Sequence, residues 1–148
     1  MSHRELLPIP PIETATDPIH SAADMRQRWR ALMGDLGFGQ RLLWVGFIGG
    51  DRRMYKTMSQ VPVRAKPQPG LTEYVMIRLP RVLAGLESGA TVALLLTRPG
   101  RGPVSNLDRE WASLLTTSAA EHGVPLEPIF RANDEAVAEV APQLRLTG

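Results

Sequence analysis

Hydrophobic residues recur with a helical period in three stretches of the chain and form short continuous runs between them. The first helical stretch begins at Ser21, which forms a capping pair with Asp24. Gly37 is placed to end this helix in a left-handed conformation, while Arg28 and Arg30 lie mostly off its apolar face. That face consists of Met25, Trp29, Leu32, Met33 and Leu36.

Two extended segments on either side of a glycine turn predict an antiparallel hairpin. Residues 40–48 form an apolar run that is typical of a buried strand. Gly49 and Gly50 supply the backbone conformations that a tight turn needs. Residues 52–61 return with a partial alternation of polar and apolar side chains, which predicts a second strand at the edge of the sheet.

A second helix and a central strand are predicted next. Leucine and valine positions in residues 71–87 mark a helical face, although a strand over residues 74–79 also fits the pattern. Pro80 removes one backbone donor and should kink this helix or begin a new one. Residues 91–97 are almost entirely aliphatic, as expected of a central strand that is covered on both faces.

The last part of the chain predicts a third helix and one or two short strands. Ser105 opens the helix with Asp108 at the capping-box position, and the helix ends at residues 121–123. Residues 126–130 predict a strand, and a turn follows at residues 133–134. Residues 136–140 fit either a short strand or a helical turn.

The order of these elements predicts an α/β protein: a mixed sheet with an antiparallel hairpin, flanked by helices. A length of 148 residues suits one domain. We expect residues 20–148 to form this domain, after an extended or disordered arm over the proline-rich residues 1–19. The longest apolar runs are too short to span a bilayer and no secretory signal is visible, so we expect a cytoplasmic protein without a membrane partner.

Charge and reactive side chains limit the chemistry. The chain has no cysteine, which excludes disulfides, thiol catalysis and cysteine-based zinc or iron–sulfur sites. His3, His20 and His122 do not form a ligand cluster by spacing. Residues 41–109 carry eleven basic and four acidic side chains, a net charge of +7. This excess predicts an anionic partner, self-association with the acidic C-terminal part, or only solvated arginines on exposed strand faces.

The segment around the central strand carries a resemblance to a known family. It reads Leu96-Thr97-Arg98-Pro99-Gly100-Arg101-Gly102, followed by Ser105-Asn106-Leu107-Asp108. With the order of elements over residues 40–141, it resembles JAB/MPN-type domains, especially the bacterial RadC-like branch, and the layout is also similar to that of cytidine deaminases. The resemblance implies a zinc site held by two histidines of a His-x-His-Pro element and by the aspartate of Ser-x-x-Asp, with an upstream glutamate as general acid and base.

The zinc ligands of that family are lost here. Pro99, Ser105 and Asp108 match, but Leu96 and Arg98 stand where the two histidines belong. A catalytic zinc needs about three protein ligands, and Arg98 places a permanent positive charge where the cation would sit. Ser105 and Asp108 are also fully explained as a helix cap. We therefore expect no metal and no cofactor, and we assign no catalytic residue.

Three functional hypotheses follow from these observations. The first is a non-catalytic interaction protein whose former metal pocket binds a protein or a small anion, with Arg98, Arg101, Ser105 and Asp108 as the binding residues. Self-association into a homo-oligomer is one form of this hypothesis. The second is a nucleic-acid-associated protein, which the basic centre and the RadC-like resemblance motivate. The third is a metal-independent or nonstandard hydrolase built on Asp108 and Ser105, for which no general base can be named.

Overall fold

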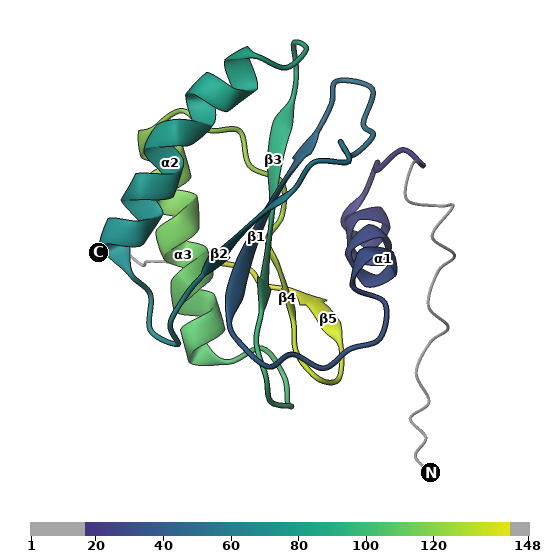
Figure 1. Cartoon of the computed structure of the whole chain (residues 1–148), viewed down its shortest axis with the longest axis vertical. Helices are drawn as coiled ribbons and strands as arrows, with labels where there is room; N and C mark the ends of the chain where they lie inside the picture. Colours follow the sequence, from purple (N-terminus) through teal and green to yellow (C-terminus); the bar gives the residue numbers. More distant parts are fainter. Residues whose placement is uncertain (1–16, 143–148) are drawn as a thin grey trace, which may run out of the picture.

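Three helices and a five-stranded mixed sheet make up residues 17–142, the part of the chain that this computed structural model describes (Figure 1). The predicted fold class and the predicted order of helix, hairpin, helix, strand, helix and strand are confirmed. The elements are α1 (Ala22–Met33), β1 (Leu42–Ile48), β2 (Ser59–Pro62), α2 (Pro69–Ala84), β3 (Thr91–Thr97), α3 (Asn106–Glu121), β4 (Phe130–Ala132) and β5 (Val137–Glu139).

The strands lie in the order β2-β1-β3-β4-β5. β1 is antiparallel to both β2 and β3, β3 and β4 are parallel, and β5 returns antiparallel to β4. Leu42, the first residue of β1, pairs with Thr97 at the end of β3 and with Pro62 at the end of β2. The beginning of β1 and the ends of β2 and β3 therefore meet at one end of the sheet.

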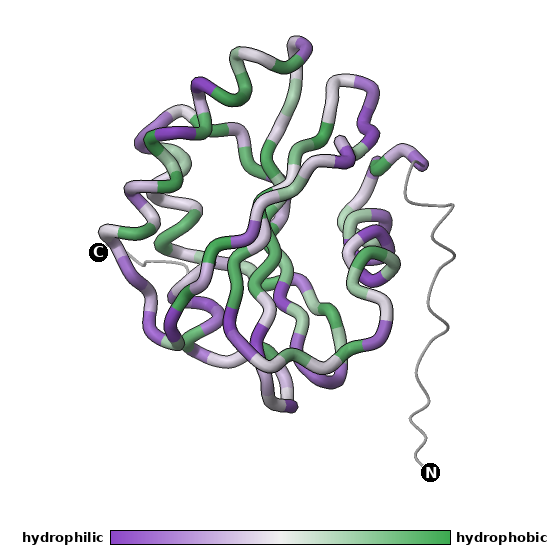
Figure 2. The backbone as a smooth tube through the Cα atoms, in the orientation of Figure 1, coloured by the Kyte–Doolittle hydropathy of each residue, from purple (hydrophilic) through white to green (hydrophobic). Residues whose placement is uncertain are grey.

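The sheet is covered on both faces, by α2 and α3 on one side and by α1 on the other (Figure 1). Along β3, Val92, Leu94 and Leu96 pack in the core beneath α2 and α3, whereas Ala93 and Leu95 pack in the core beneath α1. Hydrophobic stretches run through the middle of the sheet, and hydrophilic residues mark many of the surrounding loops (Figure 2). The predicted central strand is thus confirmed, and its continuous apolar run follows from burial on both faces.

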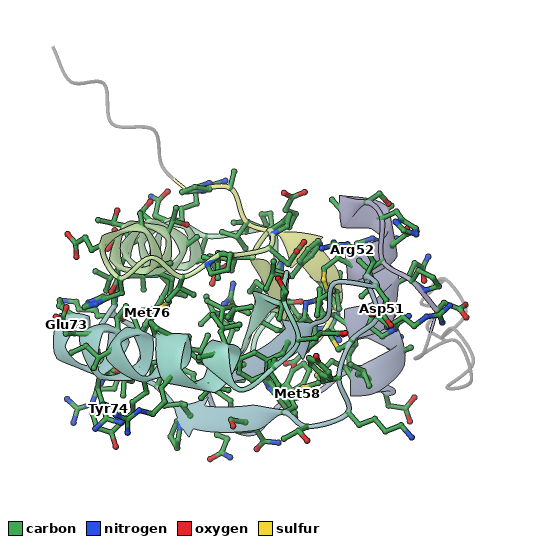
Figure 3. All side chains as sticks on the ribbon, turned by 90° about the horizontal axis from the view of Figure 1, so that it is seen from above. Asp51, Arg52, Met58, Glu73, Tyr74 and Met76 are labelled. Carbon is green, nitrogen blue, oxygen red and sulfur yellow. The ribbon has the colours of Figure 1, made fainter. Side chains whose placement is uncertain are left out.

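The returning strand of the hairpin is shorter than the sequence predicted. We expected residues 52–61, but β2 covers only Ser59–Pro62, and Met54 makes a single isolated bridge to Ile48. The turn is determined by Arg52, which has a positive φ of 67° and whose guanidinium binds both carboxylate oxygens of Glu127 at 2.7 and 3.0 Å. Figure 3 shows Arg52 on the side of the molecule where α1 lies. Contacts with distant segments thus displace the start of this strand, and a local pattern cannot reveal them.

The beginning of α1 was predicted correctly, but its end was not. The hydroxyl of Ser21 accepts a hydrogen bond from the amide of Asp24 at 3.0 Å, as expected of an N-cap. The helix ends at Met33, and Gly34, with a positive φ of 61°, is its C-cap in place of the predicted Gly37. Gly34 donates its amide to the carbonyl of Arg30, so the helix closes one turn earlier than its apolar pattern suggests.

Two arginines of α1 are buried, although the sequence placed them off the apolar face. Arg28 donates to the carbonyl oxygen of Asp17 at 2.8 Å, and Arg30 donates to the carbonyl oxygen of Gly34. Both side chains thereby satisfy backbone acceptors at the ends of the helix. The predicted arm over residues 1–19 lies mostly outside the described residues. Its residue Ile19 is buried and hydrogen-bonded to Arg52, so this last part of the arm packs against the domain.

α2 is one helix, which excludes the strand considered over residues 74–79. Pro69 lies in its first turn, where a proline costs no hydrogen bond. The helix continues through Pro80 to Ala84, so no new helix begins at this proline. Met76 is fully buried towards α3, whereas Tyr74 points away from the sheet and is 56% exposed (Figure 3).

The strand expected over residues 126–130 lies later in the chain. β4 covers Phe130–Ala132, and Leu126 makes only an isolated bridge to Val92. Pro128 interrupts the segment between them, because a proline cannot donate to a strand ladder. The open alternative for residues 136–140 is resolved as the strand β5. Within residues 17–142, no helix is both long and apolar enough to cross a membrane.

Candidate functional site

The candidate site lies at the N-terminus of α3, beside the end of β3. The hydroxyl of Ser105 accepts from the amide of Asp108 at 3.1 Å, and the carboxylate of Asp108 accepts from the amide of Ser105 at 2.9 Å. This reciprocal pair is a complete capping box, as predicted. It holds the Asp108 carboxylate over the end of β3, where the loop that leaves the strand passes.

The loop between β3 and α3 is fastened to the turn between β4 and β5. Gly100 donates its amide to the carboxylate of Asp134 at 2.9 Å, and Gly102 donates its amide to Glu135 at 2.7 Å. Asn133 donates from its side-chain amide to the carbonyl of Gly102 at 3.0 Å. Both glycines have positive φ angles, which other residues rarely adopt. The loop is therefore held in place by a neighbouring turn.

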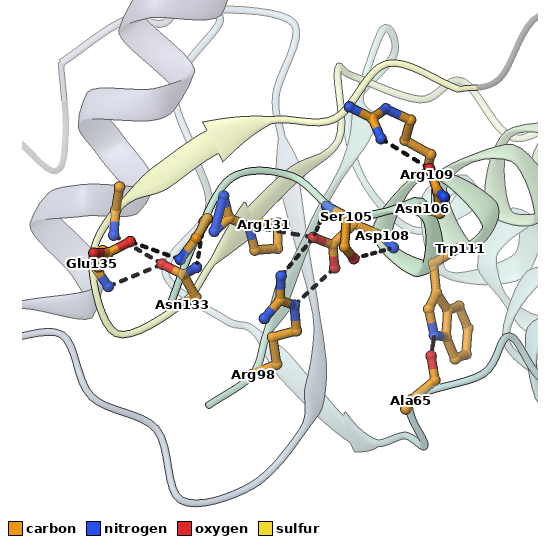
Figure 4. Close-up of polar contacts among 12 residues, drawn as sticks. Ala65, Arg98, Ser105, Asn106, Asp108, Arg109, Trp111, Arg131, Asn133 and Glu135 are labelled. Atoms are coloured by element: carbon orange, nitrogen blue, oxygen red, sulfur yellow. Dashed lines mark hydrogen bonds and ion pairs between the residues drawn. The ribbon is translucent and has the colours of Figure 1, made fainter. Parts of the chain in front are cut away.

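Arg98 and Asp108 form a doubly hydrogen-bonded ion pair (Figure 4). The Arg98 Nε donates to Asp108 Oδ1 at 2.9 Å and its Nη2 donates to Oδ2 at 2.8 Å. The side chain of Asp108 is only 4% exposed, and that of Arg98 is 15% exposed. This fork geometry is the strongest arrangement available to an arginine and a carboxylate. The Arg98 guanidinium fills the space beside Asp108, the one residue of the implied zinc-ligand set that this chain keeps.

A second arginine, Arg131 of β4, lies behind Asp108 (Figure 4). Its side chain is 2% exposed, and its Nε is 3.7 Å from Asp108 Oδ2. Among the described residues, the Nε and Nη1 atoms of Arg131 have no hydrogen-bond partner. Arg131 was not among the predicted site residues, because the strand was expected over residues 126–130. A charged residue inside the apolar stretch from Ile129 to Ala132 was the available signal.

The electrostatics of this group keep Asp108 ionised. Burial alone raises the pKa of Asp108, but hydrogen bonds from Arg98 and the Ser105 amide, with the charges of Arg98 and Arg131, outweigh burial and lower the pKa. The same hydrogen bonds to Asp108 raise the pKa of Arg98. Burial lowers the pKa of Arg131, although an arginine stays protonated in proteins. The three side chains thus carry two positive charges and one negative charge.

A pocket of about 420 Å³ opens over this ion pair. Four arginines line it: Arg41 before β1, Arg64 after β2, and Arg98 and Arg101 in the loop after β3. They converge because the start of β1 and the ends of β2 and β3 lie at the same end of the sheet. Arg41 and Arg64 have no ion-pair partner among the described residues. Arg101 lies 3.5 Å from Glu135 and is 68% exposed.

The rest of the pocket lining is mostly apolar. It includes Val63, Leu96, Val104, Leu107 and Trp111. The indole N–H of Trp111 donates to the carbonyl oxygens of Arg64 and Ala65 at 3.2 and 3.1 Å, which fixes the ring against the segment after β2. The pocket therefore combines an apolar wall with a basic rim.

The residues at the site do not fit a zinc ion. Leu96, Arg98 and Asp108 do line one pocket, so the positions that the resemblance pairs with zinc ligands lie together. Asp108 alone among them can bind a metal, and its carboxylate is occupied by Arg98. Residues 17–142 contain no group of three histidine, aspartate or glutamate side chains that could hold a metal ion. His122 lies at the other end of α3, 3.4 Å from Glu73.

The predicted binding residues Arg98, Arg101, Ser105 and Asp108 all line this pocket. The sequence did not identify Arg41, Arg64 or Arg131, because strand register brings them there. The pocket lining provides neither an activated nucleophile nor a strong general base. The Ser105 hydroxyl is engaged by the helix cap, and Asp108 is a weak base because its pKa is lowered.

No protein-family model matches the chain, and a search among curated proteins finds no relative.

Proposed function

We propose that this protein is a non-catalytic anion-binding or interaction protein on a JAB/MPN-like α/β scaffold, and that the pocket at the end of β3 is its binding site. One observation carries the proposal. Four arginines line the pocket, and Asp108, its single carboxylate, is already bound by Arg98. An arrangement of this kind attracts anions and repels cations.

The excess of positive charge is the physical basis. Four arginines and one aspartate give the lining a formal net charge of +3 (four minus one), and Arg131 adds a further charge behind Asp108. Guanidinium groups bind carboxylates and phosphates through paired, charge-assisted hydrogen bonds. A bound anion would compensate the charges of Arg41 and Arg64, which have no ion pair among the described residues.

The scaffold part of the proposal rests on the resemblance. Its support is the order of elements, together with Ser105 and Asp108 at the start of α3 and Leu96 and Arg98 around the end of β3. In JAB/MPN-type domains the corresponding positions would hold zinc. Here the guanidinium of Arg98 takes the place of a cation beside Asp108. The loss of metal chemistry and the gain of a basic pocket are then two consequences of the same substitution.

Isothermal titration calorimetry with inorganic phosphate and with acetate tests the proposal. At low ionic strength, the wild-type protein should bind phosphate saturably, and added salt should weaken binding because it screens the charges. Arg64→Gln should weaken binding by about tenfold, the effect expected for a lost charge-assisted hydrogen bond. Arg64 is exposed and has no ion pair among the described residues, so the variant should fold normally.

Arg81→Gln is the matched control, because Arg81 is an exposed arginine of α2 outside the pocket lining. This variant should bind phosphate as the wild type does. Equal weakening by the two substitutions would show that only the overall charge matters. No saturable binding of either anion would overturn the proposal.

Nucleic-acid binding is the alternative that the sequence also predicted. The geometry supports it less well, because Arg41, Arg64 and Arg98 converge on one pocket instead of following an extended groove. A DNA or RNA complex that weakens steeply with salt, and whose formation depends on arginines outside the pocket such as Arg78 and Arg81, would favour this alternative.

A further inference from the structure

We infer that the ligand of this pocket is an organic phosphate of about nucleotide size, with its phosphate on the arginines and its apolar or aromatic part on the wall formed by Val63, Leu107 and Trp111. This inference rests on the proposed function and identifies the class of anion. Three features of the pocket carry it: its charge, its size and the nature of its wall.

The charge favours a phosphate over a carboxylate. After Arg98 has been neutralised by Asp108, Arg41 and Arg64 remain without an ion pair among the described residues, and Arg101 has only an exposed ion pair with Glu135. A carboxylate supplies one negative charge, whereas a phosphate ester supplies about 1.5 to 2 and has three acceptor oxygens. Phosphate oxygens can therefore accept from several guanidinium groups at once.

A buried arginine strengthens this argument. The Nε and Nη1 atoms of Arg131 lack hydrogen-bond partners among the described residues, and the side chain shares Asp108 with Arg98. One carboxylate cannot neutralise two guanidinium groups, so the interior behind the pocket has an uncompensated positive charge. The N-terminus of α3, at Ser105, adds the positive end of a helix dipole on the same side. The charge of Arg131 and the dipole of α3 therefore both favour a multiply charged anion.

The size and the wall favour an organic ligand over inorganic phosphate. A volume of about 420 Å³ lies within the range of pockets that enclose small organic molecules. A phosphate ion would leave most of this space, and the exposed part of Leu107, in contact with water. Leu107 lines the pocket and is 37% exposed, so its side chain is accessible to a ligand there. A ring or aliphatic group attached to the phosphate would cover it.

Comparative titrations by calorimetry test this inference. The probes are inorganic phosphate, adenosine, AMP and ADP. AMP should bind about tenfold or more tightly than inorganic phosphate, because it also buries apolar surface. ADP should bind at least as tightly as AMP because of its additional charge, and adenosine should bind far more weakly than either. NMR should locate the ligand, since the indole N–H signal of Trp111 should shift, whereas that of Trp29, buried in the core beneath α1, should not.

Two variants separate the phosphate contacts from the wall contacts. Arg64→Gln should weaken both inorganic phosphate and AMP, whereas Leu107→Asn should weaken AMP and leave inorganic phosphate unchanged. Both residues are exposed, so folding should be retained, which circular dichroism can verify. Equal losses for both probes in Leu107→Asn would contradict the role of the wall.

The outcomes distinguish this inference from the function on which it rests. If phosphate binds in the pocket but AMP and ADP bind no more tightly, the inference is overturned and anion binding stands. If acetate binds more tightly than all the phosphates, the ligand class is a carboxylate and the inference is also overturned. If none of these probes binds, both proposals fail. If only a 5′-phosphorylated DNA strand binds, the inference fails in favour of a nucleic-acid partner.

Discussion

The guanidinium of Arg98 donates two hydrogen bonds to the carboxylate of Asp108, from Nε to Oδ1 at 2.9 Å and from Nη2 to Oδ2 at 2.8 Å. Asp108 also caps α3 through the amide of Ser105, and Arg131 approaches the same carboxylate from β4. One aspartate therefore links the end of β3, the start of α3 and β4. The group is structural and electrostatic at once, because it supports the pocket floor and determines the charge there.

Removal of the Asp108 charge should destabilise the fold strongly. Asp108→Asn would leave Arg98 and Arg131 close together with no carboxylate between them. Breaking a buried ion pair in this way costs about 3–5 kcal/mol. Urea denaturation at about pH 7, followed by circular dichroism, measures the change in the free energy of unfolding.

Asp51→Asn is a control of the same chemical type. Asp51 is largely exposed, and its ion pair with Arg53 has an N–O distance of 3.9 Å. Loss of such a surface pair should cost less than about 1 kcal/mol. Similar losses in the two variants would show that the Asp108 group contributes no more than a surface pair.

The stabilisation by Asp108 should disappear in acid. The folded-state pKa of Asp108 is lowered, so its contribution is complete above the ordinary aspartate pKa of about 3.9 and is lost as the pH falls through the folded-state value. Glu127, whose pKa is lowered chiefly by its hydrogen bond from Arg52, adds a loss of the same sign. The difference in unfolding free energy between wild type and Asp108→Asn should therefore be constant above about pH 5 and shrink as the pH falls below about 4. A pH-independent difference would contradict the assigned pKa direction.

Tight zinc binding should appear only when Arg98 and Leu96 are replaced together. The wild-type protein should retain far less than one zinc per chain after treatment with a chelator. The guanidinium of Arg98 occupies the metal position beside Asp108, and its positive charge repels a cation. In Leu96→His/Arg98→His, two imidazoles and Asp108 would line the same pocket, which is enough for a three-ligand zinc site. Mass spectrometry measures the zinc retained by the wild type, and a zinc titration measures binding by the double variant.

Arg98→His alone is the control for this experiment, since it supplies one imidazole and should bind zinc more weakly than the double variant. Circular dichroism must show that the double variant is folded, because Leu96 belongs to the core. Stoichiometric zinc in the chelator-treated wild type would contradict our account of the site. A folded double variant that binds no zinc would weigh against the JAB/MPN-like scaffold.

The hairpin turn should tolerate no side chain at Gly50. A Cβ atom there would lie 2.7 Å from the backbone oxygen of Ser88, a contact that side-chain rotation cannot relieve. Gly50→Ala should therefore destabilise the protein by about 1–3 kcal/mol. At Gly85, after α2, the nearest atom would be 3.5 Å away and φ is −87°, so Gly85→Ala should change stability little. Thermal unfolding of the two variants compares them, and equal melting temperatures would contradict the predicted clash.

Features that depend on a few neighbouring residues could be read from the sequence. Ser105 and Asp108 form the predicted capping box, Ser21 begins α1, and β3 occupies the predicted residues 91–97. Helix caps and hydrophobic runs are local, because each is determined by side chains within about four positions of one another. The boundaries of β2 and β4 were wrong, since contacts of Arg52 with Glu127 and the position of Pro128 decide them.

The sequence by itself determined the fold class and the N-terminal caps of α1 and α3. Only the tertiary structure decided which charges share the pocket. Arg41 and Arg64 are 57 and 34 residues from Arg98 along the chain, yet all three line it. The reason is the pairing of Leu42 with both Pro62 and Thr97, which brings three strand ends together. Arg131 reaches Asp108 because β4 pairs with β3 in parallel. Register of this kind depends on the whole sheet, and no local pattern encodes it.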